Sequence, residues 1–134
     1  MPTITRWFVK TSLVSLVIGL GIGIWQQVPG IKAAGLFPIY LHLLTFGWLT
    51  QLIFGIAIWM FPSYSKQHPR GPEWLGWGIY AALNAGLILR IIFEPLQAVS
   101  SSMLGGWMLV GAAILQWLAG VAFFANAWTR VRGR

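Results

Sequence analysis

The stretch from Pro38 to Pro62 constrains the fold more than any other part of the chain. It reads PIYLHLLTFGWLTQLIFGIAIWMFP, an apolar run with a proline at each end and a single histidine, His42. At ~1.5 Å per residue, a helix of this length crosses the ~30 Å hydrocarbon core of a bilayer. Pro38 suits the first turn of a helix, and Pro62 predicts its end. Because an imidazole inside such a segment is costly, the run also predicts a functional site at His42.

The composition places the whole chain among membrane proteins. Hydrophobic residues make up 57% and charged residues 8% of the 134 residues, which suit a single domain over 1–134. The net charge of +7 comes from basic residues scattered over termini and loops, which argues against a nucleic-acid partner. The absence of cysteine excludes disulfides, iron–sulfur clusters, thiolate metal sites and covalently attached haem.

Four apolar segments predict an all-α fold, a polytopic membrane protein with a bundle of four transmembrane helices. A cleavable signal peptide is the competing interpretation of the first segment, but Lys32 stands where cleavage requires a small residue. The Glu94-Pro95 pair is expected to stop the third helix. The predicted spans are Thr11–Trp25, Pro38–Phe61, Trp74–Phe93 and Met103–Trp128.

The basic residues predict the orientation of this bundle. With four spans, both termini and the link between the second and third helices fall on one side, together with seven basic residues. The other side holds only Lys32 and Arg90. The positive-inside rule then makes both termini cytoplasmic, in a multi-pass protein of the cell inner membrane. The seven residues are Arg6, Lys10, Lys66, Arg70, Arg130, Arg132 and Arg134.

Small and amide side chains predict how the helices pack. Gly78, Ala82 and Gly86 form a row on the third helix, which suits close packing within the bundle or self-association. One amide lies near the middle of each of the last three helices, and we expect these amides to form hydrogen bonds between helices. They are Gln51, Asn84 and Gln116. No carboxylate is expected within the hydrocarbon region.

His42 has two plausible uses. On a wheel of ~100° per residue it lies on an apolar face, opposite Gln51. One use is a hydrogen bond to a close neighbour, such as Thr45 or Tyr40. The other is axial ligation of a haem iron, with Phe46 and Leu49 on the wall of the pocket. The full face comprises Pro38, His42, Phe46, Leu49, Ile53, Ile56 and Met60.

Arg90 is expected at a depth similar to that of His42, near the non-cytoplasmic surface. A buried guanidinium requires an anion, which Glu94 or the propionates of a haem would supply. His68 differs from both, because it lies in a polar link and is expected to be solvated.

The second helix resembles the second helix of haem-copper oxidase subunit I and of the nitric oxide reductase large subunit. The residues that carry the resemblance are His42, Gly47, Gly55 and the closing Met60-Phe61-Pro62. The resemblance implies that His42 is an axial ligand of a haem b and that Arg90 binds a propionate. That family has roughly twelve helices in three groups of four, so this chain would be a single repeat, and three copies would restore the helix count.

The chain departs from that family in its histidines. It has no second intramembrane histidine and nothing to supply the three histidines of a copper site. Oxygen reduction is therefore not expected, nor is any other enzyme activity implied. The leading hypothesis is a small membrane cytochrome with an electron-transfer or haem-handling role, assembled as a homo-oligomer, with a trimer favoured over a dimer. Other respiratory-chain proteins are candidate partners.

Two other hypotheses remain open. One is a haem-free accessory or assembly subunit of a respiratory oxidase complex, in which His42 is a packing residue. The other is a small four-helix transporter, a class that usually requires a membrane-embedded carboxylate, which the first helix lacks.

Overall fold

The computed structural model describes residues 1–31 and 34–131, so Lys32, Arg132 and Arg134 lie outside the described residues. The chain forms four helical spans, each long and apolar enough to cross a membrane. The second span is divided into α2, a π-helical segment η1 and α3. The elements are α1 (Thr3–Gln26), α2 (Leu36–His42), η1 (Leu43–Thr50), α3 (Gln51–Met60), α4 (Glu73–Val99) and α5 (Met103–Val131).

The four predicted helices are confirmed, but two of their boundaries were wrong. Helix α1 begins at Thr3 rather than Thr11, and α4 continues through Pro95 to Val99. A helix can continue past a proline where neighbouring helices and local adjustments satisfy the backbone groups that the proline frees. As a result Glu94 lies within α4 and is buried, at 9% exposure. The expectation that no carboxylate lies in the hydrocarbon region stays a prediction.

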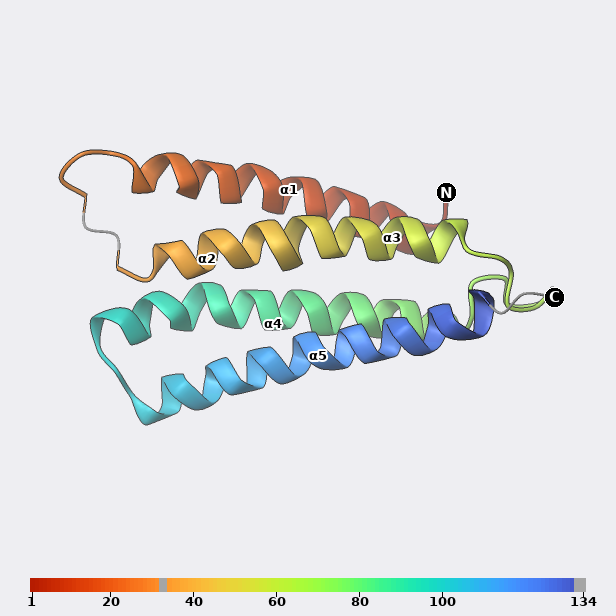
Figure 1. Cartoon of the computed structure of the whole chain (residues 1–134). Helices are drawn as coiled ribbons and strands as arrows, with labels where there is room; N and C mark the ends of the chain where they lie inside the picture. The colour runs from red at the N-terminus through yellow and green to blue at the C-terminus, as the bar shows by residue number, and fades with distance from the viewer. Residues whose placement is uncertain (32–33, 132–134) are drawn as a thin grey trace.

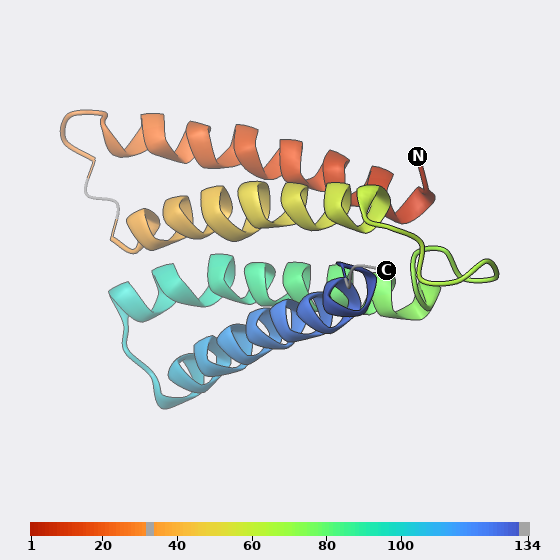
Figure 2. The same cartoon turned by 45° about the vertical axis from the view of Figure 1, so that its right-hand side comes forward.

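The spans form two hairpins that lie side by side (Figure 1). Helix α1 pairs with the second span, α4 pairs with α5, and the second span lies against α4. Among the described residues the backbones of α1 and α5 do not approach each other, so these two helices form the outer edges of an open layer. Helix α1 also reaches α4, where Thr11 Oγ1 and Tyr80 Oη lie 2.7 Å apart. The start of α1 and the end of α5 lie at the same end of the layer, and the turned view in Figure 2 agrees.

The main hydrophobic core lies toward the end that holds the termini. It is built from Ile4, Phe8, Ile58, Ile79, Leu83 and Ala119. The rings of Phe54 and Phe123 stack there with their centroids 3.9 Å apart, which joins the two hairpins. Nearer the opposite end a smaller cluster contains Ile39, Leu43 and Leu87. The two ends of the layer therefore differ in the amount of apolar packing between the hairpins.

Glycines permit the closest approaches between helices. A Cβ at Gly55 would lie 2.5 Å from the Cβ of Phe8, and one at Gly86 would lie 2.8 Å from the backbone oxygen of Ala112. Gly86 thus serves the contact between α4 and α5. Gly78 was predicted in the same row, but a Cβ at this position would have no described atom of another helix within 4 Å. Gly78 therefore faces away from the other helices.

The hydrogen bonds between helices that were expected of the three amides are confirmed. Asn84 Nδ2 donates to Gln51 Oε1 at 2.6 Å and so joins α4 to the second span. Gln116 accepts a hydrogen bond from Arg90 and so joins α5 to α4. The helical wheel was wrong for His42 and Gln51, because both side chains reach α4 in the structure.

Candidate functional site

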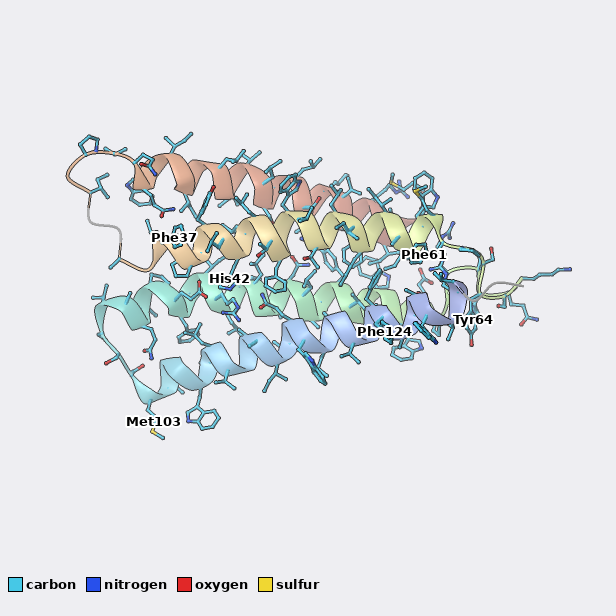
Figure 3. The ribbon with its side chains drawn as sticks, in the orientation of Figure 1. Phe37, His42, Phe61, Tyr64, Met103 and Phe124 are labelled. Carbon is cyan, nitrogen blue, oxygen red and sulfur yellow. The ribbon has the colours of Figure 1, made fainter. Side chains whose placement is uncertain are left out.

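His42 is the last residue of α2, and its imidazole points toward α4. Its Nδ1 lies 3.0 Å from Glu94 Oε1, although the ring N–H is poorly aligned for a hydrogen bond. The side chain of His42 is 24% exposed and that of Glu94 is 8% exposed. Figure 3 shows His42 between the second span and the α4–α5 hairpin. The imidazole therefore lies at the margin of the layer, with one side against a buried carboxylate.

Arg90 connects Glu94 to α5. One guanidinium nitrogen lies 3.0 Å from Glu94 Oε1, and Nε donates to Gln116 Oε1 at 2.9 Å. Four side chains from three spans thus meet in one polar cluster: His42, Arg90, Glu94 and Gln116. The prediction had left the anion beside Arg90 open between Glu94 and a haem propionate. In the structure Glu94 takes that position.

Besides His42 Nδ1, two buried atoms of this polar cluster have no hydrogen-bond partner among the described residues. They are Glu94 Oε2 and Gln116 Nε2. Since a guanidinium has only donors, Gln116 must present its oxygen to Arg90, which leaves its amide nitrogen unpaired. Buried polar groups are normally paired, and exceptions often mark sites that bind something further.

The other residues predicted around His42 lie in different environments. The Phe46 ring stacks on the imidazole, with centroids 6.0 Å apart, and packs against the main core. Leu49 is 47% exposed and belongs to the outer face of the second span. Thr45, one of the two candidate hydrogen-bond partners of His42, donates instead to the backbone oxygen of Leu41. Phe46 therefore flanks the imidazole, whereas Leu49 lies on an exposed face of the second span.

The donor set around His42 does not suit a bare metal ion. Within the described ranges no three His, Cys, Asp or Glu side chains come together as metal ligands. A haem iron has a smaller requirement, because the porphyrin supplies four ligands and the protein needs to add one axial imidazole. A carboxylate beside Nδ1 favours the tautomer that carries its proton there, which leaves the Nε2 lone pair available.

Sequence reasoning missed two features of the buried polar groups. The first is the contact between His42 and Glu94, which was hidden because the helix was expected to end at Pro95. The second is Arg130, which lies in the last turn of α5 and is only 4% exposed. Its signal in the sequence is Asn126, one helical turn earlier, whose side-chain oxygen accepts from Arg130 at 3.3 Å.

Comparisons with protein families, with curated proteins and with solved structures find no match to this chain. The resemblance of the second helix to haem-copper oxidase subunit I therefore stays a prediction that rests on its own residues. The function must be argued from the polar cluster and its surroundings.

Proposed function

We propose that this chain is a small integral-membrane protein that binds haem b through His42 and has an electron-transfer or haem-handling role. The observation that carries the proposal is the environment of the imidazole. Nδ1 lies 3.0 Å from a buried carboxylate, and the side chain is partly exposed. Metal-binding histidines commonly have a carboxylate beside the nitrogen that does not bind the metal.

The surroundings of His42 suit one face of a porphyrin. Phe46 provides an apolar surface beside the imidazole. Arg90 has five N–H donors, and its contacts to Glu94 and Gln116 leave others free for a propionate. Gln116 Nε2 is a further donor without a partner among the described residues. When bound, the iron would supply one-electron chemistry, and the protein would hold it at the end of the bundle opposite the termini.

The open layer favours assembly of several copies. His42 is 24% exposed, so a single chain covers only part of any group bound to it. Helices α1 and α5 are both free to contact a second copy along their outer faces. A trimer, with one axial histidine and one haem for each chain, fits the resemblance to a family with three groups of four helices. A dimer that shares one haem between two histidines is the alternative.

The charge distribution favours cytoplasmic termini in the inner membrane. Of the six described basic residues, five lie in the first third of α1, in the link between α3 and α4 or in the last turn of α5: Arg6, Lys10, Lys66, Arg70 and Arg130. The positive-inside rule assigns the end of the layer that holds these segments to the cytoplasm. A reporter active only in the cytoplasm, fused after Arg134, tests this orientation, and an inactive fusion would reverse it.

The absorption spectrum of the purified protein tests the proposed function. We expect a Soret band and a pyridine haemochrome spectrum of haem b, with one haem for each chain. The mass of the complex in detergent then distinguishes a trimer from a dimer. A spectrum without a Soret band after expression with added haem precursor would contradict the proposal, and two chains for each low-spin haem would contradict the trimer.

Glu94 favours a cation-coupled transporter as the second candidate function. It is a buried carboxylate within α4, and that class of protein usually requires a carboxylate in a membrane-spanning helix. Haem-free protein whose uptake of a cationic substrate into vesicles depends on Glu94 would support the transporter.

A further inference from the structure

The second span holds His42 and Gln51 against the same neighbour, α4, although an α-helix would direct them to opposite sides. His42 Nδ1 lies 3.0 Å from Glu94 Oε1, and Gln51 Oε1 accepts a hydrogen bond from Asn84 at 2.6 Å. Nine steps separate positions 42 and 51, and at ~100° each they amount to about two and a half turns. In an unbroken α-helix the two side chains would therefore point about half a turn apart.

The π-helical segment η1, Leu43–Thr50, lies between these two residues and accounts for the difference. Hydrogen bonds from residue i to i+5 hold roughly one residue more in each turn than those of an α-helix, so each residue contributes less rotation. Over the segment the rotation falls behind by about one residue, or ~100°. This brings both side chains to faces that α4 can reach.

Side-chain hydrogen bonds and close packing hold η1 in place. Thr45 Oγ1 donates to the backbone oxygen of Leu41 at 2.7 Å near one end, and Gln51 Nε2 donates to that of Gly47 at 2.9 Å near the other. A Cβ at Gly47 would lie 2.8 Å from the Cβ of Ser15, so α1 packs directly against the widened turn. Such bonds to backbone oxygens compensate for irregular helical hydrogen bonding in a membrane span.

We propose that η1 sets the helical register of His42, that is, the direction in which its side chain points. It carries one surplus residue, and this residue keeps position 42 turned toward Glu94. If the same residues formed an α-helix, position 42 would rotate by ~100° away from Glu94. Gln51 and Asn84 are positioning residues, because their hydrogen bonds hold the Thr50 end of η1 in its π-helical form. The inference concerns only the position of residue 42, so it does not depend on haem binding.

Removal of the surplus residue tests the proposal. Because the chain has no cysteine, thiol pairs can be introduced without background. The first pair is His42→Cys with Glu94→Cys, and the second is Phe54→Cys with Phe123→Cys, where the rings stack. Both pairs are treated with a short bifunctional thiol reagent in membranes. Deletion of the exposed Thr45 should convert η1 to an α-helix and keep both cross-links at the yield of the full-length chain.

Deletion of Ile88 is the matched control. Ile88 is also exposed and lies in the middle of a span, but α4 has no π segment. Its removal should rotate position 94, so the first cross-link falls by about fivefold or more, while the second is kept. If deletion of Thr45 also abolishes the first cross-link, or both, the residue is not surplus and the proposal is overturned.

Gln51→Leu tests the positioning role separately. In the full-length chain it removes the bonds to Gly47 and Asn84, so η1 can relax and the first cross-link should fall. In the chain that lacks Thr45 the same substitution should leave that cross-link unchanged, because no surplus residue remains. No fall in the full-length chain, or an equal fall in both chains, would overturn the assignment.

Discussion

The two ends of the bundle each bury an arginine, but they satisfy it in different ways. Arg130, at the end with the termini, donates to the backbone oxygens of Ile58, Phe61 and Pro62 and to Asn126 Oδ1. The three backbone oxygens lie where α3 ends, and the last turn of α3 leaves that of Ile58 without a helical hydrogen bond. Arg130 therefore caps the C-terminal end of α3. Every nitrogen of this guanidinium has an oxygen partner within the described residues.

Arg90, toward the opposite end, has a carboxylate beside it, and its neighbours have polar atoms that lack hydrogen-bond partners among the described residues. Glu94 Oε2 and Gln116 Nε2 are buried without partners among the described residues, and His42 is partly exposed. Apolar packing between the hairpins is also sparser there. A buried charge in a membrane protein therefore does not by itself mark a functional site. The difference lies in the groups that remain unsatisfied around it.

The largest expected effect is on stability, from Arg130→Ala. The substitution leaves several backbone oxygens at the end of α3 unpaired, at a cost of about 3 kcal/mol or more in the free energy of unfolding. Unfolding in mixed detergent micelles, followed by circular dichroism, measures it. Haem content of the folded fraction should be unchanged.

Arg130→Lys is the control for this prediction. It keeps the positive charge but loses the fork of donors, so we expect only partial recovery of stability. If Arg130→Ala unfolds like the unmodified chain, the cap does not stabilise the bundle and the comparison between the two arginines fails.

Glu94→Gln should affect the opposite end, and mainly haem binding. The neutral amide no longer favours the required tautomer of His42, and loss of such a neighbour typically weakens metal affinity by about tenfold or more. Haem titration of the apoprotein measures the change. Glu73→Gln removes the other acidic residue of the chain, at the exposed start of α4, and should have no effect. Equal affinities for both variants would contradict a role for Glu94.

Arg90→Ala should give the smallest of the three effects. A propionate would lose a charge-assisted hydrogen bond, so we expect haem to dissociate a few times faster, or its reduction potential to shift. Arg6→Ala removes an exposed arginine at the opposite end as the control. If Arg90→Ala matches the unmodified chain in both properties, Arg90 serves only Glu94.

The sequence was sufficient to predict four helical spans, because long apolar runs between Pro- and Gly-rich links leave few alternatives. It also predicted a similar depth for His42 and Arg90 and named Glu94 as a candidate partner of Arg90. In the structure both His42 and Arg90 lie beside Glu94. The contact between His42 and Glu94 could not be predicted, for two reasons. A helical wheel assumes a constant ~100° per residue, which η1 does not follow. Pro95 suggested an end to α4, but the helix continues past it to Val99.

Haem content after His42→Ala tests the central claim most directly. His68→Ala is the matched control, because His68 lies in the polar link at the end with the termini. The account predicts that His42→Ala removes the Soret band from folded, membrane-inserted protein, while His68→Ala keeps one haem for each chain. Stoichiometric haem in the His42→Ala variant would contradict the account.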